Sequence, residues 1–113
     1  PWFMAEIQDG VSAVPTLISA GVELHGAVPN PFNPLTKIGF RLAKNSSAVS
    51  LDVYDLAGRR VQSLIAAESF AAGEHSAIWQ GRDETGRSVP SGIYFVRLQA
   101  QGQVKTGRLL LVK

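Results

Sequence analysis

The sequence predicts an all-β protein that folds as an antiparallel β-sandwich. From residue 35 onward, segments with strand character recur about every ten residues, and turn-forming residues separate them. Within these segments apolar and polar residues alternate, which is the period of a strand that buries one face. No stretch shows a convincing 3.6-residue period, so we expect little or no helix.

The connections between these segments have recognisable turn chemistry. Gly58 lies where a tight hairpin needs a residue at positive φ. Asp83 and Gly86 fit a type I turn followed by a glycine in the left-handed region. Residues 68–74 predict a longer connection, and residues 88–92, which contain a proline, predict a bend. The expected strands are therefore Leu35–Ala43, Ala48–Leu56, Arg60–Ala66, His75–Gln80, Ile93–Ala100 and Gln103–Val112.

The alternation also predicts which side chains form the core. Tyr94 and Val96 share one face of their strand, and Arg97 on the other face indicates that the Tyr94 face is buried. The expected core consists of Ile38, Phe40, Leu51, Val53, Trp79, Tyr94, Val96 and Leu98. A competing interpretation makes the aromatic residues an exposed platform for stacking carbohydrate rings, formed by Phe40, Trp79, Tyr94 and Phe95.

A proline-rich segment precedes the first expected strand. Its three prolines fix φ and remove three backbone donors, so no helix or central strand can run through it. Residues before proline are extended, which makes the segment a kinked strap. It consists of Pro29, Asn30, Pro31, Phe32, Asn33 and Pro34. The strap is either a rigid boundary, with Phe32 plugging one end of the sandwich and Asn30 and Asn33 capping turns, or a device that sets the angle to a preceding domain.

The strap predicts a division of the chain into an apolar N-terminal extension, residues 1–27, and a sandwich, residues 28–113. The extension is too hydrophobic for a flexible linker. It is either a connection or the end of a preceding domain, or it contains a strand, Val14–Ala20 or Ala20–Leu24. Such a strand would pair with an edge of its own sheet or with a neighbouring copy as a donated strand.

Composition excludes several classes of protein. The 113 residues suit one small domain with an extension. The net charge is only +2 and the basic residues are scattered, so we expect no nucleic-acid partner. There are no cysteines, and therefore no disulfides or thiolate metal sites. No apolar run reaches the ~20 residues that span a bilayer. The chain opens at Pro1 without a signal peptide, so we expect any export signal to lie upstream.

Catalytic residues are not expected. The sequence has two histidines, His25 and His75, and both are predicted on the surface rather than beside a nucleophile. Acidic residues come in close pairs, Asp52 with Asp55 and Asp83 with Glu84. Their positions in a strand or turn favour solvation or the capping of N–H groups over acid–base chemistry. We expect no cofactor and no metal site, although oxygen ligands in the 83–86 loop leave Ca²⁺ as an alternative there.

Several ordered motifs resemble a bacterial domain family. They are the segments 30–38 (NPFNPLTKI), 53–61 (VYDLAGRRV), 72–75 (AGEH), 79–87 (WQGRDETGR) and 90–98 (PSGIYFVRL). This pattern is similar to the C-terminal sorting domains of the type IX secretion system and to the immunoglobulin-like domain of the flagellar hook-capping protein. Family members usually have Asp after the tryptophan, where this chain has Gln80. The resemblance implies an immunoglobulin-like sandwich of about seven strands in an exported protein, and it does not extend to residues 1–27.

We therefore expect a non-catalytic module for sorting and surface anchoring, secreted or on the cell surface, with protein partners in the export or attachment machinery. The expected recognition surface is the last hairpin, Ile93–Lys113. Its apolar end is either central in a sheet or covered by another segment. The expected interaction residues are Leu109, Leu110, Leu111, Val112 and Lys113. Two alternatives stay open: a self-assembling subunit of an extracellular filament that donates a strand from residues 1–27, and a polysaccharide-binding module.

Overall fold

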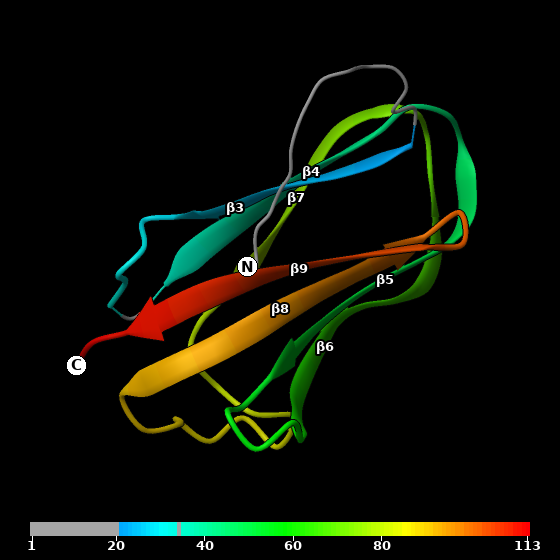
Figure 1. Ribbon diagram of the computed structural model, residues 1–113. Helices are drawn as coiled ribbons and strands as arrows, with labels where there is room; N and C mark the ends of the chain where they lie inside the picture. The colour runs from blue at the N-terminus through cyan, green and yellow to red at the C-terminus, as the bar shows by residue number, and fades with distance from the viewer. Residues whose placement is uncertain (1–20, 34) are drawn as a thin grey trace.

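The computed structural model describes residues 21–33 and 35–113, which form two antiparallel sheets packed face to face (Figure 1). The three-stranded sheet has the order β3 (Val22–Val28), β4 (Thr36–Leu42), β7 (Gly73–Trp79). The four-stranded sheet has the order β6 (Arg60–Phe70), β5 (Ser46–Tyr54), β8 (Gly92–Ala100), β9 (Gln103–Leu111). The predicted all-β sandwich is confirmed.

Strands β4, β5, β8 and β9 lie where the alternation predicts them, with ends within two residues of the expected ones. In β4 the burial alternates without interruption along the whole strand, since Thr36, Ile38, Phe40 and Leu42 all point inward. This regularity follows from its position in the middle of its sheet, paired on both sides. A continuous ladder keeps the two-residue period intact.

The expected connection over residues 68–74 is wrong, because β6 continues to Phe70 and the next strand begins at Gly73. Ala67 has a positive φ of 51°, and the pairing register of β6 with β5 shifts repeatedly. Such bulges insert residues that break the alternation while the strand continues. The side-chain hydroxyl of Ser50 on β5 accepts a hydrogen bond from the Ala67 N–H at 3.2 Å, which supports the irregular backbone.

The sandwich also begins earlier than expected. Strand β3 ends at Val28, so the boundary predicted between residues 27 and 28 falls inside a strand that pairs with β4. Gly26 has a φ of 94°, and the register shifts between Leu24 and Gly26. This bulge hides the two-residue period in the sequence. The expected strand Ala20–Leu24 overlaps β3 in part, whereas Val14–Ala20 and the remainder of residues 1–20 lie outside the described residues.

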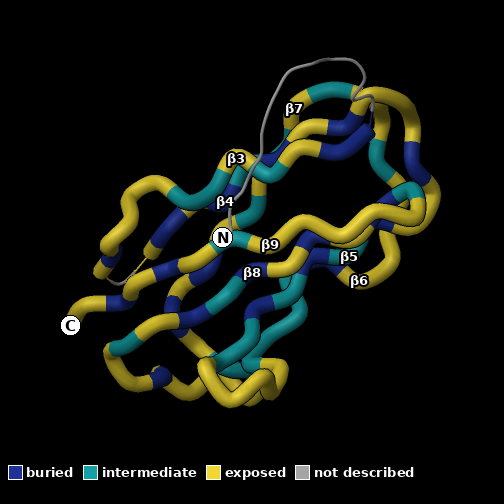
Figure 2. Tube along the Cα trace, in the orientation of Figure 1, coloured by how far each residue is buried: buried dark blue, intermediate teal, exposed yellow. Residues whose placement is uncertain are grey.

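The core lies between the two sheets, where the inward-facing residues of every strand meet (Figure 2). Each of the eight residues expected in the core is buried, and Tyr94, at 6% exposure, is the most accessible of them. The core also contains residues that the prediction did not include, namely Val22, Phe32, Leu42, Val49, Ile65, Val89, Ala100, Leu109 and Leu111. Within the described residues, no helix has the length and apolar character needed to cross a membrane.

Candidate functional site

One end of the sandwich is closed by the strap and by buried aromatic rings, and we call it the strap end. Phe32 is 2% exposed and packs against Trp79 with ring centroids 5.4 Å apart. Tyr94 contacts the other side of Trp79 at 5.2 Å. Because three large rings fill this end, Phe32 serves as the plug between the sheets. Offset or tilted pairs of this kind add about 0.5–1.5 kcal/mol each beyond burial.

The polar atoms of these rings are satisfied inside the fold. The Trp79 indole N–H donates to the Arg82 carbonyl at 2.9 Å, and the Tyr94 hydroxyl donates to the Pro90 carbonyl at 2.6 Å. Burial, with a smaller contribution from the Asp55 charge, raises the pKa of Tyr94, so its hydroxyl stays protonated as a donor. These rings are therefore unavailable to a ligand. Phe40 is also fully buried, and of the four rings proposed as a carbohydrate platform only Phe95 reaches the surface in part.

The strap also pairs with the edge of β9. The Phe32 N–H donates to the Leu110 carbonyl and the Val112 N–H donates to the Phe32 carbonyl, both at 3.0 Å. The Asn30 side chain donates to the Arg108 carbonyl at 3.0 Å and accepts from the Leu110 N–H at 2.9 Å. One alternative for the strap expected Asn30 to cap a turn, and in the structure its side chain bonds to β9 instead. Its side-chain amide makes the donor and acceptor bonds that the backbone of a neighbouring strand would make, and so covers the end of β9.

The covering segment explains the apolar run at the end of β9. Leu109 and Leu111 point into the core and are fully buried, whereas Leu110 and Val112 are 39% and 46% exposed. The expectation that the whole run is offered to a partner is thus too broad, because alternate residues belong to the core. The Lys113 N–H donates to the Ser91 hydroxyl at 3.1 Å, which ties down the segment after the strand.

The exposed members of the hairpin form a continuous outer face. Ile93 lies opposite Leu110, and Phe95 lies opposite Arg108, in the ladder between β8 and β9. Ile93 and Leu110 are each 39% exposed. Next to them lies a shallow hollow of about 300 Å³ lined by Tyr54, Leu56, Phe95, Arg97 and Thr106 among others. We call Ile93, Phe95, Arg108, Leu110 and Val112 the hairpin face. Its mixture of aliphatic, aromatic and arginine side chains is typical of protein interfaces.

Two loops at the strap end share one local structure. In both 55–59 and 83–87 the sequence is Asp-x-x-Gly-Arg. In each, an Asp Oδ1 accepts from the N–H groups two and four residues later, at 2.9–3.0 Å. Gly58 and Gly86 have φ values of 86° and 87°. The predicted turns are therefore present, and the aspartates organise them.

This bonding removes the aspartates from the candidates for chemistry. A hydrogen bond from the Arg59 N–H lowers the pKa of Asp55, with its charge and side chain adding to the effect. A hydrogen bond from the Thr85 hydroxyl lowers the pKa of Asp83, with the Arg87 N–H second. Both carboxylates are thus held charged by local donors, the opposite of what a general acid needs. No cluster of three metal-ligating side chains occurs among residues 21–33 and 35–113, and the donors around Asp83 account for the 83–86 loop without Ca²⁺.

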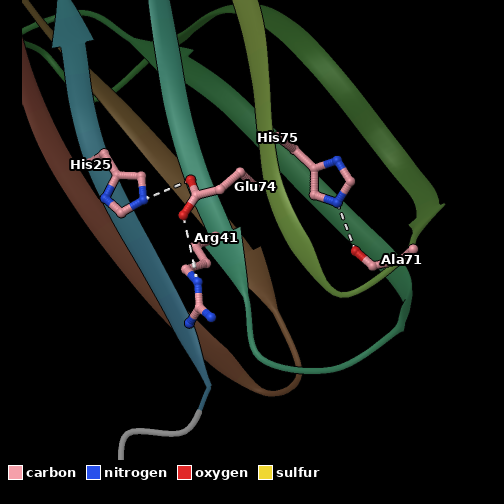
Figure 3. Close-up of polar contacts among 5 residues, drawn as sticks. All are labelled: His25, Arg41, Ala71, Glu74 and His75. Atoms are coloured by element: carbon pink, nitrogen blue, oxygen red, sulfur yellow. Dashed lines mark hydrogen bonds and ion pairs between the residues drawn. The ribbon is translucent and has the colours of Figure 1, made fainter.

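His25 lies on the outer face of the three-stranded sheet, whereas His75 is half-buried on the inner face of β7, where its ring packs against Phe40 and Phe70 (Figure 3). Neither histidine bonds to a hydroxyl nucleophile among the described contacts. His25 Nε2 is 3.0 Å from Glu74 Oε1, and Arg41 Nε is 3.5 Å from Glu74 Oε2. Glu74 thereby connects β3, β4 and β7. His75 Nε2 is 2.6 Å from the Ala71 carbonyl oxygen. These exposed contacts tie strands together, and exposed ion pairs of this type contribute about 0–1 kcal/mol.

With this geometry described, the family of the chain can be decided. Residues 30–103, well over half of the sequence, match the family model of the FlgD Ig-like domain. The chain belongs to this family. The predicted resemblance and the immunoglobulin-like class of the sandwich are both confirmed. The FlgD Ig-like domain is a family of non-catalytic modules, and the match begins at Asn30, the strap residue that binds β9.

Solved structures with the same fold include FlgD from P. aeruginosa and two proteins of Porphyromonas gingivalis. FlgD is 25% identical with a TM-score of 0.58, and the match covers 82% of this chain and 74% of FlgD. Dimeric latent PorU is 18% identical with a TM-score of 0.62, over 80% of this chain and 9% of PorU. PorZ, described as an essential bacterial surface component of the type-IX secretion system, is 22% identical with a TM-score of 0.55, over 80% of this chain and 11% of PorZ.

The chain therefore spans only about a tenth of the length of PorZ and PorU. At these identities the likeness shows the fold, and the activities of the whole proteins do not transfer with it. No match was found among curated proteins.

Proposed function

We propose that this FlgD Ig-like domain is a non-catalytic sorting and surface-anchoring module of a secreted protein, located outside the cytoplasm. The observation that carries the proposal is the hairpin face, an exposed apolar surface held in place by the strap in a domain without a catalytic constellation among its described residues. The similarity of fold to PorZ, a surface component of the type-IX secretion system, supports the same assignment.

The hairpin face has the physical properties that recognition requires. Ile93, Leu110 and Val112 expose apolar surface that folding leaves unburied, and each exposes more than a third of its area. Arg108 stands among them, and arginine with aromatic neighbours is enriched at the centres of interfaces. The strap fixes the backbone of this surface through the hydrogen bonds of Asn30 and Phe32. A rigid surface loses little conformational entropy when it binds a partner.

The test is export of a reporter protein fused to the chain in a bacterium with a type IX secretion system. Deletion of the end of β9 is unsuitable, because Leu109 and Leu111 are core residues. The double substitution Leu110→Ser with Val112→Ser instead changes only exposed side chains. We expect the variant to fold like the parent in circular dichroism and thermal melting, and to be exported at least tenfold less.

The matched control is Ile78→Ser, which changes an exposed isoleucine of similar accessibility, 52%, on the outer face of the other sheet. It should leave export unchanged. If the parent fusion is not exported, or if the double variant is exported as well as the parent, the proposed sorting function is wrong. Equal losses for the control and the double variant would also contradict it, since they would indicate a general effect of surface polarity.

A further inference from the structure

The edge of β9 is divided into a covered half and an open half. β9 is the last strand of its sheet and has β8 on one side only. The backbone groups of Leu110 and Val112 point away from β8, because they bond to the strap. Backbone direction alternates along a strand, so the N–H and C=O groups of Val104 and Thr106 point the same way.

The strap does not reach this second pair. Its contacts with β9 begin at Arg108, and no described strand pairs with the outer side of Val104 or Thr106. Val104 is 47% exposed, and Thr106 is exposed as well. Unpaired backbone donors and acceptors along a strand edge are a template for another strand. The open half is therefore the stretch from Gln103 to Gly107.

The charges along β9 indicate which kind of segment can pair with its open half. The segment from Gln103 to Lys113 contains no acidic residue, while Lys105 and Arg108 are exposed on opposite faces of the strand. Neither side chain forms an ion pair with the described part of the chain. A second copy pairing through the same edge would bring these cations against one another, and like charges across a strand pair are destabilising. An extended segment with carboxylates would neutralise both.

We propose that the open half of β9 binds an extended, acidic peptide segment of another protein as an added strand. The backbone of that segment would bond to Val104 and Thr106, and its carboxylates would lie beside Lys105 and Arg108. Main-chain hydrogen bonds provide the affinity in this mode of recognition, and the side chains that alternate along the strand provide the specificity. Lysine at an edge ordinarily deters pairing, and the same charge selects for a partner of opposite sign.

This inference does not depend on the proposed sorting function. The hairpin face is a surface of side chains near the strap, whereas the open half is a row of backbone groups at the other end of the strand. Arg108 borders both and is the one residue that the two assignments share. The same domain can therefore bind an export component through one and an acidic segment through the other. Each assignment can fail without the other.

The probe is a nine-residue peptide in which pairs of adjacent Glu residues are separated by pairs of Val and Thr, so that carboxylates lie on both faces of the added strand. It is added to the full chain labelled with ¹⁵N. We expect it to slow hydrogen exchange of the Val104 and Thr106 amides at least tenfold. The amides of Leu110 and Val112 already bond to the strap and should change little. Binding should weaken with salt, since screening reduces attraction between exposed charges.

Three comparisons complete the test. A peptide with Lys in place of Glu tests the charge, and an acidic peptide with Pro at every second position tests the backbone pairing, because proline lacks the N–H. Thr106→Pro removes an outward N–H from the chain itself, and we expect at least tenfold weaker binding.

If the Lys peptide or the Pro peptide binds as well as the acidic strand, the proposal is wrong. It is also wrong if hydrogen exchange of the Val104 and Thr106 amides is as slow in the free chain as in the presence of the peptide, since the edge would then be filled already. The two peptide controls decide the matter even if Thr106→Pro does not fold.

Discussion

The two ends of the sandwich are closed in different ways. At the strap end, three aromatic rings are buried and their polar atoms bond to backbone carbonyls. At the opposite end, which we call the far end, the chain is tied by hydrogen bonds of polar side chains. Asn45 accepts from the Ala72 N–H at 2.9 Å, and the Gln101 amide donates to the Lys44 carbonyl at 3.0 Å and to the Ser46 hydroxyl at 2.6 Å.

The aromatic residues at the two ends also differ in how far they are buried. Phe40, Phe70 and His75 cluster toward the far end, with Phe40 and Phe70 centroids 5.7 Å apart. Only Phe40 of these is fully buried. Burial of apolar area contributes roughly 25 cal/mol per Å², so the strap end should hold more of the stability than the far end. The difference indicates that the surface around the strap is the rigid part of the domain.

The largest effect on stability is expected when one aromatic ring is removed from each end of the sandwich. Trp79→Ala leaves a cavity between Phe32 and Tyr94 and frees the carbonyl of Arg82, and we expect it to cost about 3–5 kcal/mol. Phe70→Ala removes a ring that is only partly buried, so its cost should be less than half as large. Urea denaturation of both variants measures the difference. Equal losses of unfolding free energy would contradict the proposed asymmetry.

A smaller effect is expected for the link between the strap and β9. Asn30→Ala removes two hydrogen bonds to Arg108 and Leu110, which at about 0.5–1.5 kcal/mol each predicts a loss of roughly 1–3 kcal/mol. Hydrogen exchange at the Leu110 amide should become faster, while the open half of β9 should not change. Asn33→Ala is the matched control, since it changes the same residue type in the same strap. An equal loss for Asn33→Ala would show that the Asn30 bonds are not the cause.

The parts of the fold that could be predicted from the sequence are those with a local or regular signal. Turns that are encoded by adjacent residues, such as Asp55–Arg59 and Asp83–Arg87, were predicted in place because an aspartate and a glycine specify them locally. Strands with an unbroken two-residue period, such as β4, were also predicted. Only the first part of β3 was predicted, as one alternative, because the bulge at Gly26 interrupts its period, and the length of β6 was missed because of the positive φ at Ala67.

The candidate site was less accessible to sequence reasoning. Leu109 to Val112 could be recognised as an apolar run that needs a cover, but not which residues provide it. Asn30 and Leu110 are eighty residues apart in the chain, and no local pattern connects them. The Asn-Pro-Phe spacing was a usable signal, since prolines leave the strap with few N–H groups, and the remaining polar groups of Asn30 and Phe32 need partners elsewhere in the chain. The open half of β9 follows only from the strand order and from where the strap ends.

The smallest expected effect concerns charge at the strap end. The pKa values of Asp55 and Asp83 are lowered from 3.8 by local donors, first the Arg59 N–H and the Thr85 hydroxyl respectively. Between the lowered pKa of the folded state and the ordinary value, the unfolded chain binds more protons than the folded chain. Stability therefore rises with pH through this window, is complete above about pH 4, and is lost as pH falls through the folded pKa.

Replacing both residues, Asp55→Asn with Asp83→Asn, keeps an oxygen acceptor in each loop and removes the charge. We expect the double variant to be less stable than the parent at pH 7 and to approach it as the pH falls below 4. Urea denaturation between pH 2 and pH 7 measures this convergence. Because both carboxylates are exposed, the effect should be smaller than that of Asn30→Ala. A parent and a variant that lose stability in parallel below pH 4 would show that other carboxylates, away from the strap end, control the acid response of the domain.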